Sequence, residues 1–310
     1  MKNPVQIIEP PSQEINALLG DFRWASDSAA PLVIEYSFYD SGSEFYIDAR
    51  YGYDESDPEY DLPFRNGFRG FSEQDQLLVR AVFDDLESAI AIDFVEVEDS
   101  LDSDLRFGYT DLELEGADGV AFGPSAQFLP FEIDTEELYE TSELSGDIWI
   151  DDDINQLFFR ETLVHEIGHA LGLSHSFESG FEIVGDIENV ILDGELDYLR
   201  YTIMAYDLVP DSVSDSSVQF YGTAESFMPL DIQALQYLYG ESSNTSDDVY
   251  AISYFGDSPS IFGYNDFVEH NYDNAYLSIV DDGGYNALIF FIDEDLQINL
   301  APDSWSTTAG

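Results

Sequence analysis

Residues 165–175 read HEIGHALGLSH and contain three of the four histidines in the chain. His165 and His169 are four positions apart, so on a helix they share one face about 6 Å apart along the axis. Both rings could then reach one ion. His175 could join them only if the helix ended first, and Gly172 stands where it should end, because glycine adopts the left-handed terminating conformation at least cost.

Three imidazoles that meet at one point predict a zinc site. They leave the fourth tetrahedral position to water, which distinguishes a catalytic zinc from a structural one. Glu166 adjoins the first histidine and is placed to accept a proton from that water as a general base. The short string HExxH also occurs by chance on solvated amphipathic helices, but the extended string is far more specific. The remaining histidine, His270, is expected to be a surface or hydrogen-bonded residue.

At this motif the sequence resembles the metzincin metalloproteases, whose pattern includes a methionine turn downstream. Residues 201–206, YTIMAY, look like that turn. The resemblance implies that Met204 lies beneath the zinc ligands and that Tyr206 approaches the metal from the side. In the serralysin branch this tyrosine stabilises the transition state, a catalytic role that Tyr206 inherits by resemblance. Spacing alone also allows Met204 to be an ordinary core methionine.

The resemblance to serralysins extends over roughly residues 20–300. It is closer to serralysins than to astacins or matrixins, because the Met-x-Tyr turn and a helix ending in Leu-Tyr-Gly occur together. One departure is Ser176, which stands where the family usually has proline, so a different loop shape is expected after His175. The matching segments are 21–24, 33–38, 72–90, 104–109, 146–150 and 229–240.

Alternation of apolar and polar residues predicts five short strands. They are Val33–Phe38, Asp93–Val97, Leu105–Tyr109, Val120–Gly123 and Ile148–Ile150.

Helical spacing predicts three helices. The first, Ser72–Ile90, has a core-facing stripe of Leu77, Val79, Ala81, Val82, Leu86 and Ile90. The second begins near Asn155 and carries Leu157, Leu163, Val164 and Ile167 toward the sheet. The third is Pro229–Tyr239, with proline in its first turn and glycine after its end. The expected fold is therefore an α/β (α+β) metzincin protease domain, with a twisted five-stranded mixed sheet, three main helices and a small β-rich C-terminal region.

The segment 119–124, GVAFGP, resembles the metzincin strand above the active site. By that resemblance Gly119, Val120, Ala121 and Phe122 bind a peptide substrate as an added antiparallel strand. Backbone hydrogen bonds then give affinity that does not depend on sequence, so broad specificity is expected. An ordinary buried strand is the alternative.

Charge limits the partners of this chain. Nine Lys and Arg residues against 65 Asp and Glu give a net charge of −56, which excludes nucleic acid and anionic membranes as partners. With 44% hydrophobic and 15% aromatic residues the chain can build a sizeable core. The near absence of lysine indicates adaptation to high ionic strength, where salt screens the repulsion between carboxylates. The sequence has no cysteine, which excludes disulfides.

The sequence divides into three parts. Residues 1–20 are read as a propeptide or N-terminal extension, 21–241 as the zinc metalloprotease domain, and 242–310 as a β-rich region resembling the start of a serralysin C-terminal domain. No apolar span of membrane length and no N-terminal signal are seen. Serralysins are exported by a system that reads a C-terminal signal, so the resemblance implies a secreted, extracellular protein.

A calcium site is also implied by resemblance. The GGxGxDxUx repeats that follow in serralysins are lacking, so this chain is either a natural short form or part of a longer protein. One Ca²⁺ is expected from oxygen ligands on two loops, although Asp-Asp-Gly-Gly also suits a tight turn. The implied ligands are Asn244, Ser246, Asp248, Asp281, Gly283, Gly284 and Asn286.

The sequence therefore predicts a secreted, monomeric, zinc-dependent endopeptidase with broad specificity for proteins and peptides. Two alternatives stay open. One is a processing protease of narrow specificity, and the other is a catalytically silent zinc-containing binding protein.

Overall fold

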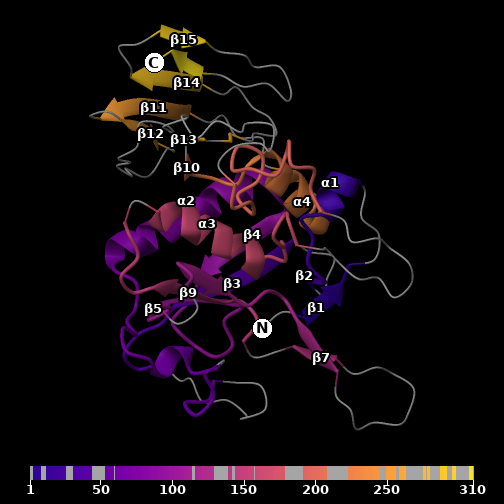
Figure 1. The fold of residues 1–310 in the computed structure, drawn as a ribbon, viewed down its shortest axis with the longest axis vertical. Helices are drawn as coiled ribbons and strands as arrows, with labels where there is room; N and C mark the ends of the chain where they lie inside the picture. The colour runs from indigo at the N-terminus through magenta and orange to yellow at the C-terminus, as the bar shows by residue number, and fades with distance from the viewer. Residues whose placement is uncertain are drawn as a thin grey trace.

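A computed structural model describes most of the first 243 residues and separate strands after them. The described ranges are 3–7, 12–25, 31–43, 53–58, 60–113, 116–128, 139–141, 144–156, 158–178, 191–207, 223–243, 249–255, 258–262, 275–276, 278–279, 287–291, 295–297 and 307–309. The layers of the fold can be followed in Figure 1.

A five-stranded mixed sheet organises the N-terminal part, as the sequence predicts. Its strands are β3 (Leu32–Phe38), β4 (Ile92–Glu96), β5 (Leu105–Thr110), β6 (Gly119–Ala121) and β9 (Asp147–Asp151), in the order β4-β3-β5-β9-β6. All neighbours are parallel except β6, which is antiparallel to β9. The sheet therefore ends in one antiparallel edge strand.

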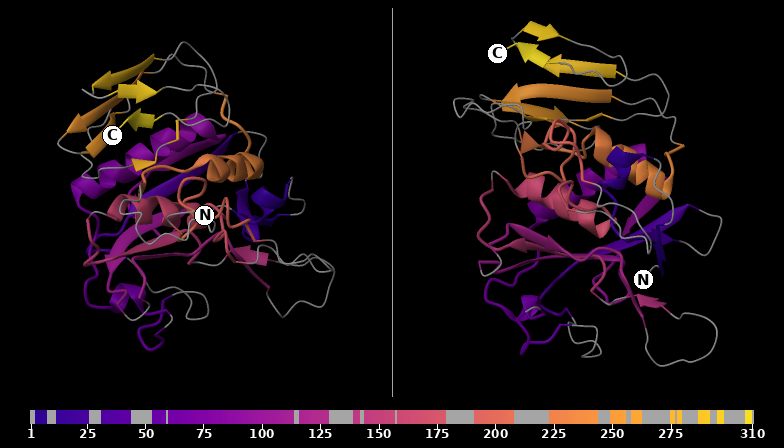
Figure 2. Two further views of the ribbon diagram at one scale, coloured as in Figure 1. Left: turned by 45° about the horizontal axis from the view of Figure 1, so that its top comes forward. Right: turned by 45° about the vertical axis from the view of Figure 1, so that its right-hand side comes forward.

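Three helices accompany this sheet. They are α2 (Glu73–Ala89), α3 (Phe159–Ala170) and α4 (Pro229–Tyr239). Helices α2 and α3 cover the same face of the sheet in Figures 1 and 2. The predicted bounds of the first and third helices are close to those observed, because Ser72 caps α2 with a reciprocal bond to Asp75 and Pro229 opens α4.

Two details of the helix predictions are wrong. Helix α3 begins at Phe159 rather than near Asn155, because the Phe158 amide bonds the Asn155 carbonyl in a tight turn before the helix starts. Leu77 is 43% exposed and does not belong to the core stripe of α2. It lies about 200° around the helix from Val79, which is on the buried face. Leu157 lies outside the described residues.

The main hydrophobic core lies between the sheet and its helices. Leu163, Val164 and Ile167 of α3 are fully buried in it, as predicted. A second, smaller core contains Trp149 of β9 and lies on the opposite face of the sheet, because Ile148 and Ile150 on either side of Trp149 belong to the main core. It is made of Tyr39, Tyr53, Leu62, Leu112, Leu144 and Trp149.

The second core contains a buried carboxylate, Asp147. Tyr53 donates a hydrogen bond from its hydroxyl to Asp147 Oδ2 at 2.8 Å and accepts one from Trp149 Nε1 at 2.6 Å. The Arg106 guanidinium lies over the Tyr39 ring, 4.1 Å from its centroid. Burial raises the pKa of Asp147 to about 6, against the opposing effect of Arg106 and the two tyrosines.

This raised pKa predicts a pH-dependent stability. The folded pKa of Asp147, about 6, exceeds the unfolded value of about 3.9. The proton on Asp147 therefore stabilises the folded state fully below about pH 3.9, and this stabilisation is lost as pH rises through about 6. Asp147→Asn removes this loss of stability, because the amide does not ionise. The free energy of unfolding of the variant minus that of wild type should be about 1 kcal/mol higher at pH 8 than at pH 5. Urea unfolding at both pH values measures this difference. If the free energy of unfolding changed equally with pH in the two proteins, the prediction would be wrong.

The N-terminal segment is packed into the molecule. It comprises β1 (Asn3–Gln6), α1 (Gln13–Asn16) and β2 (Phe22–Ala25), and β1 pairs antiparallel with β2. Leu18 and Leu19 are fully buried in the main core, and Ile15 is buried with them. The described part of residues 1–20 is therefore continuous with the predicted protease domain. Whether this segment is ever removed as a propeptide stays a prediction.

The remaining elements are short or belong to the C-terminal region, where the predicted β-rich part lies at one end of the molecule (Figure 1). Strand β11 pairs antiparallel with β12 and parallel with β14. The seven predicted calcium ligands lie outside the described residues, as does His270. No helix in the described part of the chain is long and apolar enough to cross a membrane. The elements are η1 (Leu62–Phe64), β7 (Ala126–Phe128), β8 (Tyr139–Thr141), β10 (Thr223–Ala224), β11 (Val249–Phe255), β12 (Ser258–Phe262), β13 (Ala275–Tyr276), β14 (Ala287–Phe291), β15 (Asp295–Gln297) and β16 (Thr307–Ala309).

Candidate active site

Helix α3 carries His165 and His169 on one face. Each ring is held at Nδ1 by a backbone carbonyl, His165 by Ile203 at 2.7 Å and His169 by Leu173 at 3.0 Å. A carbonyl oxygen can only accept, so Nδ1 of each ring carries the proton. The Nε2 lone pairs of both histidines are therefore free to bind a cation.

The end of α3 turns the chain toward His175. Gly172 has a φ of 98°, in the region that favours glycine. Its amide bonds the His169 carbonyl at 2.9 Å, and the Leu173 amide bonds the Gly168 carbonyl at 2.9 Å. This pair of bonds is a Schellman motif, which stops the helix and reverses the chain.

The N-terminal segment holds the turn that follows. The Gly20 amide bonds the Gly172 carbonyl at 2.8 Å, and the Ser174 amide bonds the Leu18 carbonyl at 2.9 Å. These bonds place the residue next to His175 against the buried N-terminal segment. Sequence reasoning missed this contribution, because it assigned residues 1–20 outside the protease domain.

Two aromatic side chains satisfy carbonyls that the end of α3 leaves unpaired. Trp24 Nε1 donates to the Ala170 carbonyl at 2.8 Å, and the Tyr239 hydroxyl donates to the Leu171 carbonyl at 2.6 Å. Both belong to segments, 21–24 and 229–240, in which the sequence resembles the serralysins. The contacts themselves are long-range and leave no local signal in the sequence.

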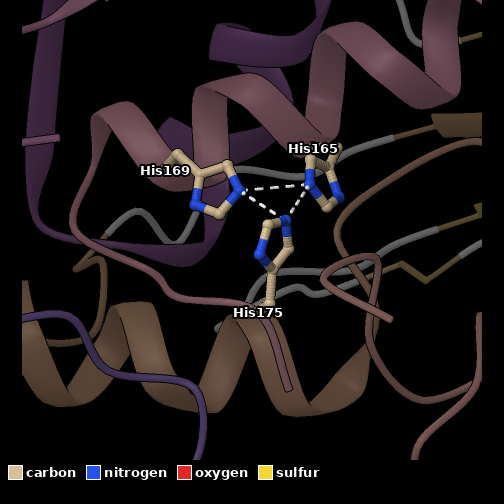
Figure 3. Close-up of side chains that lie close together, drawn as sticks. All are labelled: His165, His169 and His175. Atoms are coloured by element: carbon tan, nitrogen blue, oxygen red, sulfur yellow. Dashed lines mark hydrogen bonds between the residues drawn. The ribbon is translucent and has the colours of Figure 1, made fainter. Parts of the chain in front are cut away.

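The three histidine rings converge on one point, as Figure 3 shows. Nε2 of His169 lies 3.1 Å from Nε2 of both His165 and His175, and the latter two nitrogens are 3.2 Å apart. Nitrogens that bind a tetrahedral zinc at about 2.05 Å are about 3.3 Å from one another. The described residues hold no other cluster of His, Cys, Asp or Glu of this kind.

The charge state of the rings also fits a metal. Burial lowers the pKa of His165 to about 4 and that of His169 to about 3, so both rings are neutral at neutral pH. Neutral imidazole is the form that binds zinc. Their Nε2 lone pairs face one another at 3.1 Å, an arrangement that a cation between them would stabilise. The donor set therefore fits a zinc ion with one open position.

Glu166 is 5% exposed and lies beside this cluster on α3. Burial raises its pKa to about 8, so burial alone favours the protonated carboxyl group at neutral pH. A divalent cation nearby would favour the ionised form.

The predicted methionine turn lies against α3. Met204 is fully buried, and its Sδ would be 2.8 Å from a β-carbon at Gly168, between the two helical histidines. Asp231 in the first turn of α4 fixes this turn. Its carboxylate accepts from the Thr202 hydroxyl at 2.6 Å and the Ile203 amide at 2.8 Å. The turn therefore connects α4 to the carbonyl that orients His165.

Ser176, the departure from the family pattern, is fully buried. Its amide bonds the Met204 carbonyl at 3.3 Å, which a proline could not do. Its hydroxyl donates to Asp197 Oδ1 at 2.5 Å, and the same oxygen lies 3.2 Å from the Met204 carbonyl oxygen. The serine thus links the segment after His175 to the methionine turn.

The open side of the cluster is aromatic. The Tyr206 hydroxyl lies 3.0 Å from His175 Nε2, and the Tyr206 side chain is 67% exposed. Phe177, at 38% exposed, stacks on His175 with ring centroids 4.9 Å apart and contacts the Tyr206 ring at 4.8 Å. Glu178 Oε1 is 3.1 Å from His175 Nδ1, but the two atoms do not form a hydrogen bond. Sequence reasoning missed Phe177, whose only signal was its place two residues after a ligand.

The predicted substrate strand is the sheet edge nearest this site. Strand β6 pairs with β9 through Gly119 with Ile150 and Ala121 with Ile148, and it has no second neighbour among the described strands. Gly119, Val120, Ala121 and Phe122 are all half-buried. The observed strand starts one residue before the predicted one and ends at Ala121.

The sheet, the terminated helix and the three histidines resemble those of a metzincin-type peptidase domain, and comparisons with known proteins agree. The family model described as Matrixin matches residues 66–182. A serralysin of Photorhabdus luminescens is 26% identical over 97% of this chain and 58% of its own length. The metallopeptidase AprA of Pseudomonas marginalis is 32% identical over 51% of this chain and 32% of its own.

The chain is thus similar to the serralysins and to the matrixin family. It spans about 60% of the length of the serralysins that it matches over nearly its full extent. The match to a solved structure of myroilysin covers 70% of this chain and 95% of that chain, with 16% identity and a TM-score of 0.36.

Proposed function

We propose that this chain is a secreted zinc-dependent endopeptidase that hydrolyses proteins and peptides with broad specificity. The observation that carries the proposal is the convergence of three Nε2 atoms within 3.2 Å of one another beside the buried Glu166. A metal-binding protein without activity has no need of a carboxylate at this place.

The zinc ligands in this proposal are His165, His169 and His175. When bound, zinc supplies Lewis acidity that activates water and polarises the scissile carbonyl. Glu166 accepts the proton of the attacking water and delivers it to the leaving amine. Tyr206 donates a hydrogen bond to the oxyanion that develops on the carbonyl, and Met204 supports the ligands from below.

The substrate in this proposal lies along β6 as an added strand. Backbone groups of residues 119–122 at the sheet edge would bind the peptide main chain, which favours broad specificity. The net charge of −56 supports a protein that works at high salt and away from anionic surfaces. Secretion is proposed from the serralysin resemblance, and the monomeric state and the calcium site stay predictions.

Casein hydrolysis by the purified chain tests the proposal. We expect hydrolysis that 1,10-phenanthroline abolishes and that added Zn²⁺ restores, and we expect denatured proteins unrelated to casein to be cleaved as well. Cleavage of only one sequence in a peptide library would instead indicate a narrow processing protease. If folded, zinc-loaded protein cleaves neither casein nor the library, the enzymatic proposal is wrong.

A further inference from the structure

Gly119 of the edge strand β6 lies directly against the side chain of Glu166. A β-carbon at position 119 would be 2.7 Å from both Cγ and Oε1 of Glu166, and 2.8 Å from Cγ2 of Thr162. These distances are well below van der Waals contact. The carboxylate of Glu166 thus occupies the volume that any other residue at position 119 would fill with its side chain.

The backbone does not explain this glycine. Gly119 is not among the glycines with positive φ, and its strand pairs regularly with β9, so any residue could adopt its conformation. Ala121, two residues along, faces the same side and packs against the main core, whereas Val120 packs on the second core. A methyl group therefore fits on this face at 121, but at 119 it meets Glu166.

The strand and the helix are both fixed. Next to Gly119, the Asp151 amide bonds the Asp118 carbonyl at 2.9 Å, and on the other side the Phe122 amide bonds the Asp147 carbonyl at 2.9 Å. Thr162 stands on the buried helix α3, one turn before Glu166. The part most able to yield to a methyl group is the terminal carboxylate of Glu166.

We propose that Gly119 is a positioning residue for the general base: the absence of a side chain lets the Glu166 carboxylate lie against β6, beside the three histidines. The inference rests on the proposed function. It gives Gly119 a role beyond peptide binding, which would use its backbone alone. Since a misplacement of about 1 Å can cost about 10²-fold in rate, Gly119→Ala is expected to lower kcat by about 10- to 100-fold.

The kinetic test compares Gly119→Ala with Gly42→Ala. Gly42 lies in the loop after β3, away from the site and without a positive φ. We expect Gly119→Ala to lower kcat while KM stays within a few-fold and one zinc per chain is retained, and we expect Gly42→Ala to behave as wild type. Unchanged kcat, or a loss that appears only in KM or in zinc content, would overturn the inference and favour a purely substrate-binding glycine.

A double-mutant cycle with Glu166→Ala gives a readout that does not need activity. Gly119→Ala should lower the urea midpoint when Glu166 is present, because the methyl group and the carboxylate compete for one volume. In the Glu166→Ala background that loss should become smaller, with only the part due to Thr162 Cγ2 remaining, and Gly119→Ala should cause no further fall in residual activity. Equal losses of stability in the two backgrounds would refute the contact even if the chain proved not to be a protease.

Discussion

Glu166→Ala is expected to lower kcat for casein or peptide hydrolysis by about 10²- to 10⁴-fold, the contribution typical of a positioned general base. Zinc should remain bound, because the three ligand nitrogens and the carbonyls that orient them do not involve Glu166. Zinc content and the absorption spectrum of the cobalt-substituted protein would show that the ligand geometry is kept.

A matched control is available on the same helix. Glu161 is half-buried and accepts a hydrogen bond from the Ala224 amide at 3.1 Å, and it is not one of the three residues of the histidine cluster. Glu161→Gln keeps the shape and an acceptor, so its kcat should stay within a few-fold of wild type. If Glu166→Ala retained wild-type kcat with zinc bound, another group would have to be the base.

Deletion of residues 1–20 is expected to prevent stable folding. Burial of an Ile or Leu side chain contributes about 1.5–3 kcal/mol, and the deletion removes the buried Ile15, Leu18 and Leu19. The sum, about 5–9 kcal/mol, is comparable to the whole free energy of unfolding of a typical domain, about 5–15 kcal/mol. The two backbone bonds that hold Gly172 and Ser174 would be lost as well.

Point substitutions separate packing from chain length. Leu18→Ala should lower the free energy of unfolding by about 2–5 kcal/mol, whereas Val5→Ala, at an exposed position of β1, should change it by less than about 0.5 kcal/mol. Urea unfolding of each variant, with zinc content, measures both. A deletion variant with the wild-type urea midpoint and bound zinc would show that the segment is dispensable, as a removable propeptide is.

Local sequence predicted the elements that local physics determines. Strands β3, β5 and β9 and helices α2 and α4 were expected close to their observed bounds, because side-chain periodicity, Ser72 as a cap and Pro229 at a helix start act within a few residues. The prediction for Leu77 was wrong because this residue lies on the exposed side of helix α2 and not on its buried face. Helix α3 begins later than predicted because of the turn that the chain makes between β9 and the helix.

The sequence by itself determined the chemistry of the site, since HExxHxxGxxH fixes which nitrogens can meet and where the helix must stop. Only the tertiary structure decided what holds them. Leu18 and Gly20 hold the turn after α3, Asp231 fixes the methionine turn, and the space at Gly119 admits Glu166. These partners are far from the motif in sequence, and packing that joins distant segments leaves no periodic signal in either one.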